Sequence, residues 1–240
     1  MTTRLFTSAL FAGLVAGLIA VLLQWSIMEK LILEGEEYET GNKNHFAGVL
    51  VINEVAEAND QAVIEDEEEP ENLFKRFSLA FFASFVVFVG WSLMMTAGFA
   101  IAEKFGKRIT IKDGLLWGIA GYAAVHMLPS IGLPPELPGT PAAELELRQL
   151  WWVSTVVASV LGFALIAYGQ SVFYVVIGLA LLVAPHLIGA PHMEGYSGLA
   201  PPELSGEYVA RSLAVGMIAW AVLGLAAGYI WNRGAASNPI

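Results

Sequence analysis

Six long apolar runs alternate with short polar segments along this chain. Each run is close to the roughly 20 residues that an α-helix needs to cross about 30 Å of hydrocarbon. None of them contains Lys, Arg, Asp or Glu. A bilayer accepts backbone only as helix or closed barrel, and uninterrupted apolar runs exclude the alternating pattern of a barrel. The predicted transmembrane helices cover residues 5–28, 77–102, 114–133, 150–168, 171–190 and 212–231.

Composition strengthens the membrane assignment. Of the 240 residues, 56% are hydrophobic and 14% are charged, which is more apolar surface than a soluble domain of this length can bury. We therefore expect an all-α integral membrane protein with a single membrane domain over residues 1–240. The first run is too long for a signal peptide, and Leu23-Gln24-Trp25 is a poor cleavage site. The absence of cysteine excludes disulfides and thiol chemistry.

The charges are distributed unevenly between the predicted loops, and this predicts an orientation. The net charge is −10, and nearly all the acids fall in long segments on one side of the membrane. Half of the basic residues fall in the short segments on the other side, namely 1–4, 103–113, 169–170 and 232–240. Because basic residues concentrate in short cytoplasmic loops, both termini are expected in the cytoplasm. Segment 29–76 is then an acidic extracytoplasmic loop, although Lys75 and Arg76 argue weakly against this orientation.

Two sequence patterns bear on how the helices are arranged. Residues 126–137 and 192–204 each run His-Met, then Gly-Leu, then Pro-Pro-Glu-Leu, with spacings that differ by one residue. This predicts a parallel repeat of two hairpins in the second half, unless Pro-rich helix ends merely look alike. Small residues also recur four apart, and such rows let helix backbones approach closely. Examples are Gly13 and Gly17, Gly114 and Gly118, Ala158 and Gly162, and Gly224 and Gly228.

Potential metal ligands gather near the predicted outer ends of the helices. His126 and His186 fall inside apolar runs at a similar depth, about 20 Å from the inner boundary at about 1.5 Å per residue. Polar residues inside a membrane tend to be functional. Imidazole, carboxylate and thioether groups suit ions such as cobalt(II) or nickel better than magnesium or calcium. The candidate metal ligands are His126, His186, His192, Met127, Met193, Glu34, Glu36 and Glu39.

The two intramembrane histidines also allow interpretations without metal transport. Each could hydrogen-bond a neighbouring helix, where Ser154, Thr155 and Ser159 are available. The pair could instead be the axial ligands of a b-type haem, since both lie at one depth. Nothing else in the sequence indicates redox chemistry.

Several classes of function lack the residues that they need. The predicted spans hold no carboxylate, Lys or Arg, so the usual proton relay of a secondary transporter has no residue to use. There is no phosphate-binding loop, nucleophile elbow or zinc-protease signature, and we expect no enzyme. We also expect no tightly bound cofactor and no nucleic-acid partner.

Three stretches resemble a known family. They are Leu-Ile-Leu-Glu-Gly-Glu-Glu-Tyr-Glu at 31–39, the Gly-Leu-Pro-Pro-Glu-Leu-Pro-Gly turn at 132–139 that leads into Arg-Gln-Leu-Trp-Trp at 148–152, and Ala-Pro-His at 184–186. Together they resemble the CbtA family, the predicted cobalt transporter subunit of bacteria, nearly end to end. The resemblance implies a multi-pass protein of the bacterial inner membrane. It also implies a partner, CbtB, which is a small single-span protein with a His-rich tail.

Members of this family are often described with five spans, whereas the hydropathy pattern here predicts six. The difference concerns the gap at 169–170, because a single bent helix there would put the C-terminus outside. Residues 150–190 make about twice a span, which favours six.

The expected function is uptake of cobalt or a similar divalent metal. The acidic loop and His192 would capture the ion outside, and it would then pass His186 and His126. The rival is a non-transporting accessory subunit of a larger membrane complex that docks through its glycine faces. A second copy of the chain, in a homo-oligomer, is also among the partners to be considered.

Overall fold

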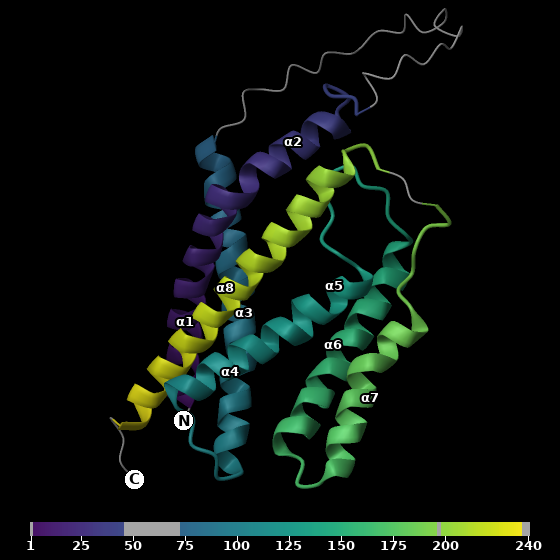
Figure 1. Ribbon diagram of the computed structural model, residues 1–240. Helices are drawn as coiled ribbons and strands as arrows, with labels where there is room; N and C mark the ends of the chain where they lie inside the picture. Colours follow the sequence, from purple (N-terminus) through teal and green to yellow (C-terminus); the bar gives the residue numbers. More distant parts are fainter. Residues whose placement is uncertain (1, 46–72, 196–197, 237–240) are drawn as a thin grey trace, which may run out of the picture.

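The chain folds into helices only, across the residues that the computed structural model describes: 2–45, 73–195 and 198–236. Figure 1 shows a bundle of tilted helices with a separate antiparallel hairpin, α6 and α7, beside it. Two of the long helices contain a π-helical turn, labelled η. The elements are α1 (Thr2–Leu23), η1 (Gln24–Met28), α2 (Glu29–Glu39), α3 (Leu73–Lys104), α4 (Ile111–Tyr122), η2 (Ala123–Met127), α5 (Leu128–Gly132), α6 (Leu145–Tyr168), α7 (Val172–Ile188) and α8 (Pro202–Ala236).

The predicted all-helical membrane fold is confirmed. Within the described residues, five continuous helices are long and apolar enough to cross a bilayer: Thr2–Glu39, Phe77–Lys104, Ile111–Gly132, Leu145–Tyr168 and Pro202–Gly234. The sixth, α7, has 17 residues, which span about 25 Å at about 1.5 Å per residue. Helix α6 ends at Tyr168, α7 begins at Val172, and the two run antiparallel (Figure 1). The gap at 169–170 is therefore a turn between two helices, not a bend in one.

Two helices extend well past their predicted ends. The first continues through the π turn to Glu39, so the acidic segment predicted to begin at 29 starts inside a helix. The last begins at Pro202, ten residues before the predicted position 212. Proline suits the first turn of a helix because its missing N–H has no intrahelical partner there. Hydropathy marks only the part of a helix that lies in hydrocarbon. Most of the acidic loop, residues 46–72, lies outside the described residues.

The predicted small-residue rows are sites of close helix contact. A Cβ at Gly13 of α1 would lie 2.6 Å from the Cα of Val89 on α3. Gly114 of α4 meets Gly228 of α8, where the corresponding distance is 2.7 Å to Cα, and Gly162 of α6 meets the carbonyl of Gly178 on α7 at 2.8 Å. Backbones at such distances exclude any side chain. The pairs α1–α3, α4–α8 and α6–α7 are thus each held by glycine contacts.

An ion pair ties α1, α3 and α8 together at the end where the chain begins and finishes. Both guanidinium NH groups of Arg4 donate to the carboxylate of Glu103, each at 3.0 Å. The Arg4 Nε donates to the Trp231 carbonyl at 2.8 Å, and the Trp231 Nε1 donates to Glu103 at 2.8 Å. Helix α1 therefore begins, and α8 ends, at the same end of the bundle (Figure 1). That this end faces the cytoplasm stays a prediction.

The two similar sequences of the predicted repeat adopt different local structures. Residues 134–137 form an irregular segment, whereas the matching letters at 201–204 open α8 as a helix. The main packing partners also cross the predicted hairpins, because α4 packs on α8 and α6 packs on α7. The similar sequences at 134–137 and 201–204 therefore do not share a local structure.

Candidate functional site

Both π-helical turns pack against the first half of α8, at the end of the bundle opposite the termini. A π turn loosens the α-helical hydrogen-bond ladder and often marks a functional site. Arg211 of α8 donates to the carbonyl of Ile27 in η1 at 3.2 Å. The Tyr122 hydroxyl, just before η2, donates to the carbonyl of Leu213 at 2.8 Å. Side chains of different helices thus brace both irregular turns.

His126 lies inside the second π turn. Its ring stacks on Tyr122, with centroids 6.0 Å apart and an interplanar angle of 16°. It also meets Trp220 of α8 edge-on at 5.9 Å. The side chain is otherwise exposed on the bundle surface. The alternative of a hydrogen bond from His126 to Ser154, Thr155 or Ser159 is not seen among the described residues, where the ring packs on Tyr122 and Trp220.

His186 lies in the last turn of α7, directly after Pro185. Its Nε2 is buried, and no group among the described residues hydrogen-bonds to it. The imidazole lies 5.9 Å from the ring of Trp151 on α6. The Trp151 Nε1 donates to the Pro185 carbonyl at 3.2 Å, which pins α6 to α7 beside the histidine. An unpartnered imidazole nitrogen can bind a metal ion through its lone pair.

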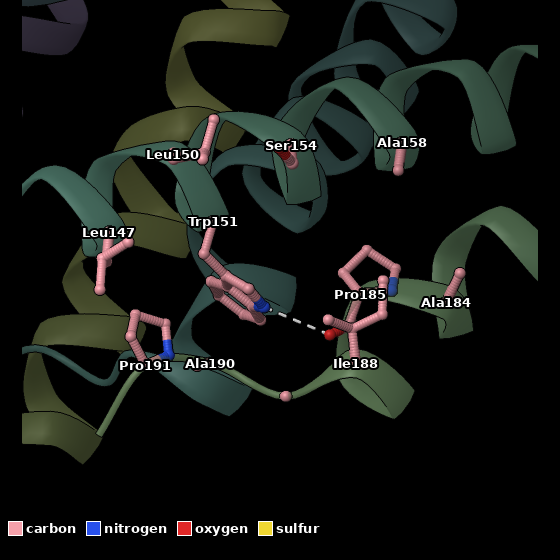
Figure 2. A pocket seen from close by; sticks show the side chains of 11 residues that line it. Leu147, Leu150, Trp151, Ser154, Ala158, Ala184, Pro185, Ile188, Ala190 and Pro191 are labelled. Carbon is pink, nitrogen blue, oxygen red and sulfur yellow. Dashed lines mark hydrogen bonds between the residues drawn. The ribbon is translucent and has the colours of Figure 1, made fainter. Parts of the chain in front are cut away.

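A groove of about 530 Å³ opens next to this contact, between the ends of α6 and α7. Figure 2 shows Trp151, Pro185 and Ile188 around it, with the bond from Trp151 to the Pro185 carbonyl. Its lining is almost entirely apolar, with Ser154 as the one hydroxyl side chain, and His186 is not part of it. Such a groove suits a hydrocarbon chain and offers nothing to a hydrated ion.

The remaining candidate ligands lie further out. His192 and Met193 are exposed on the irregular segment between α7 and α8, and Met127 is exposed at the end of η2. Glu34, Glu36 and Glu39 lie on α2, a helix rather than a loop.

The negative charge on α2 is partly compensated. Lys43 lies 3.4 Å from Glu34 and 2.6 Å from Glu37. The hydrogen bond to Glu37 raises the pKa of Lys43 above its ordinary value. Carboxylates that already neutralise a lysine attract a cation less strongly, so α2 is a weaker attractor than its count of acids suggests.

The candidate ligands do not converge on one point. Across the part of the chain that the structure describes, no three His, Asp or Glu side chains lie close enough together to hold a metal ion. His126 packs against α8 and His186 against α6, so the two rings have different neighbours. Among the described residues, the candidate ligands therefore do not form a common coordination sphere.

Comparison with known proteins decides the family. The model of the family described as "Probable cobalt transporter subunit (CbtA)" matches residues 2–232, nearly the whole chain. This chain belongs to the CbtA family. No match was found among curated proteins or among solved structures.

In this CbtA chain, two of the stretches that carried the resemblance touch each other. A Cβ at Gly35 of α2 would lie 3.2 Å from both Leu137 and Pro138 in the turn between α5 and α6. Leu137 is 3% exposed beneath α2. Glu136 of the same turn pairs with Arg148 of α6 at 2.7 Å. The turn and α2 therefore form one cap over the end of the bundle that carries the histidines.

Some polar residues near the candidate site were not predicted. Arg211 and Tyr122 brace the π turns, and Trp220 forms part of the surroundings of His126. Nothing in a single sequence marks a π turn, because it differs from α-helix by one inserted residue. The only signal for Arg211 was its place as the sole Arg at the start of the last apolar run.

Proposed function

We propose that this CbtA chain is the membrane subunit of an uptake system for cobalt(II) or a similar divalent transition metal. The family description supports transport of cobalt by an assembly in which this chain is one subunit. The metal is the cargo of the protein, not a resident cofactor. Catalysis has no part in the proposal.

The observation that carries the proposed path is the buried Nε2 of His186, which has no hydrogen-bond partner among the described residues. Leaving a buried polar atom unpaired costs free energy, and such groups commonly have a functional use. A neutral imidazole is also the commonest protein ligand for divalent transition metals. His186 is therefore the first intramembrane station of the proposed path, and His126 is the second.

Capture would occur on the capped end of the bundle. His192 and Met193 follow His186 on the exposed segment after α7, and α2 carries Glu34, Glu36 and Glu39. These groups lie outside the hydrocarbon spans, where a hydrated cation can exchange water for imidazole and carboxylate without entering the bilayer. With this end outward, the proposed movement is inward.

Energy for uptake could come from the membrane potential. A potential of about 100 mV is worth about 2.3 kcal/mol per unit charge, or about 4.6 kcal/mol for a divalent ion. A CbtB-like small subunit with a His-rich tail is the proposed partner, and it would deliver metal to the His192 end. The proposed location is the bacterial inner membrane.

The first experiment measures uptake of radioactive cobalt. Cells that lack other high-affinity cobalt importers would express this chain with and without a CbtB-like subunit. His186→Ala is expected to lower the initial rate about tenfold or more, the scale of losing one interaction that holds the metal, and His126→Ala to lower it as well. His45→Ala is the control for loss of a histidine side chain, because His45 follows α2 outside the apolar helices and is not on the proposed path.

Equal uptake by the His186→Ala variant and the unaltered chain, at equal abundance, would contradict the histidine path. Background uptake in every strain, with the protein inserted and paired with its partner, would contradict transport itself. The accessory subunit would then be the better proposal, and stable co-purification with large membrane partners and no metal would support it. A Soret band in the purified protein would instead indicate the haem alternative.

A further inference from the structure

A second polar cluster lies deep in the bundle, between α1 and α3. Ser8 of α1 and Ser92 and Thr96 of α3 are each 0% exposed. The Thr96 hydroxyl donates to the carbonyl of Ser92 at 2.8 Å. The Oγ atoms of Ser8 and Ser92 have no hydrogen-bond partner among the described residues. This cluster is distinct from the histidine stations.

The helix register places the three hydroxyl groups at one level. Gly13 of α1 faces Val89 of α3, and Gly17 faces Phe85. The two helices are therefore antiparallel, and a move of four residues toward the C-terminus of α1 corresponds to a move of four residues toward the N-terminus of α3. Extending this antiparallel alignment places Ser8 opposite position 94, midway between Ser92 and Thr96. From this register we place the hydroxyls in a shared layer, with Ser8 about one turn, roughly 6 Å, from Arg4 along α1 and Thr96 about two turns, roughly 10 Å, from Glu103 along α3.

Elsewhere in the described core, buried hydroxyls are satisfied within their own helix. Thr155 donates to the Trp151 carbonyl at 2.8 Å, and Ser159 donates to the Thr155 carbonyl at 2.7 Å. That bond to the preceding turn is the ordinary solution for a serine or threonine in an apolar helix. Ser8 and Ser92 do not form this bond, so their hydroxyl groups can donate a hydrogen bond to a bound molecule.

A further unpartnered donor lies on α8, next to the residue that precedes Ser92 in the chain. The Nε1 of Trp220 on α8 is buried without a partner among the described residues. Its ring lies 5.3 Å from that of Trp91, the neighbour of Ser92 in the chain. Native proteins pair buried polar atoms with protein groups, with ordered water or with ions. Three hydroxyls and no carboxylate suit water, which needs two to four polar partners.

We propose that Ser8, Ser92 and Thr96 form an internal water-binding site in the α1–α3–α8 bundle. Water reaches it from the end that Arg4 and Glu103 close, since their side chains remain 18% and 27% exposed. In this proposal, water occupies the interior of the bundle between the Arg4–Glu103 end and the rings of Trp91 and Trp220. This water-binding site does not depend on whether the chain transports a metal.

The test uses exchange of a thiol proton with D₂O, followed by the infrared S–H band. The chain has no cysteine, so each single-cysteine variant reports one position. Ser8→Cys and Ser92→Cys are the probes. Ala12→Cys is the matched control, because Ala12 is also 0% exposed and lies one turn further along α1. Phe105→Cys, at an 80% exposed position, gives the rate in free contact with solvent.

The thiols of Ser8→Cys and Ser92→Cys are expected to exchange at least about tenfold faster than that of Ala12→Cys. Exchange no faster than in Ala12→Cys would overturn the proposal. A second measurement uses Met95, a native side chain three positions after Ser92 on α3. Radiolysis of water in the full chain should oxidise Met95, which is 6% exposed, and Ser8→Ala/Ser92→Ala should lower that oxidation. Unchanged oxidation of Met95 in the double variant would also overturn it.

Discussion

The helix bundle and the α6–α7 hairpin differ in how they are held. In the bundle, α1 buries eight residues, Ser8, Ala9, Ala12, Gly13, Ala16, Gly17, Ala20 and Val21. In the hairpin, α7 buries only Gly178 and Pro185. The hairpin joins the rest mainly through contacts of α6 with η2 and α5, and through larger side chains such as Trp152 and Phe163 that pack on the core.

This difference separates a rigid part from a more loosely attached one. In lipid, apolar side chains gain little by leaving one apolar surface for another, so close packing of small residues and polar ties decide which helices stay together. The bundle has both, whereas the hairpin is tied to itself more than to the bundle. His186 belongs to the hairpin and His126 to the bundle, so relative movement of the two parts would change the distance between these two histidines.

The largest expected effect comes from breaking a glycine contact of the bundle. In Gly224→Ala, the new Cβ would lie 2.3 Å from the carbonyl of Gly114, so α4 and α8 must separate. We expect a loss of about 3 kcal/mol in unfolding free energy, measured by SDS titration in mixed micelles.

The matched control is Gly206→Ala in the same helix, where a Cβ would meet nothing within 4 Å. It should stabilise the protein by about 0.5 kcal/mol, because alanine restricts the unfolded chain. Equal behaviour of the two variants would show that the glycine contact does not hold the bundle.

An intermediate effect is expected from removing the polar tie of the bundle. Arg4→Ala leaves Glu103 without its bidentate partner and removes the bond to the Trp231 carbonyl. We expect a loss of about 2 kcal/mol by the same titration, in line with hydrogen bonds to charged groups. Arg233→Ala removes an exposed hydrogen bond to the Tyr229 hydroxyl and a cation–π contact with the same ring, and it should change stability little. A loss as large in Arg233→Ala would indicate that terminal charge in general is responsible.

The smallest effect is expected inside the hairpin. Trp151→Phe keeps an aromatic ring but removes the bond from Nε1 to the Pro185 carbonyl, with an expected loss of about 1 kcal/mol. Amide hydrogen exchange near residues 185–188 should rise. Trp152→Phe is the control, because the indole N–H of Trp152 makes no hydrogen bond to any described residue. If exchange rises equally in both variants, the bond does not stabilise this end of α7.

Much of the fold could be predicted because the membrane imposes a simple rule. The six apolar runs coincide with helices, and the break near Gly169 is where the loop-length argument placed it. Hydropathy did not predict the extension of the first helix to Glu39 or the start of the last helix at Pro202. Outside the hydrocarbon, a helix does not need apolar residues. Of the site, the placement of His126 and His186 within apolar helices followed from sequence, but the partners of both rings did not.

By itself, the sequence determined the all-helical membrane fold, the approximate limits of the apolar helices, the presence of glycine contact faces and the location of polar residues along each helix. The tertiary structure alone decided which helices pair, that Arg4 meets Glu103 and Trp231, and that the hydroxyls of Ser8 and Ser92 are buried without a partner among the described residues. Lipid-facing and buried positions are equally apolar in a membrane protein. Hydropathy therefore reports depth in the bilayer, while the rotation and neighbours of each helix depend on packing between segments far apart in the chain.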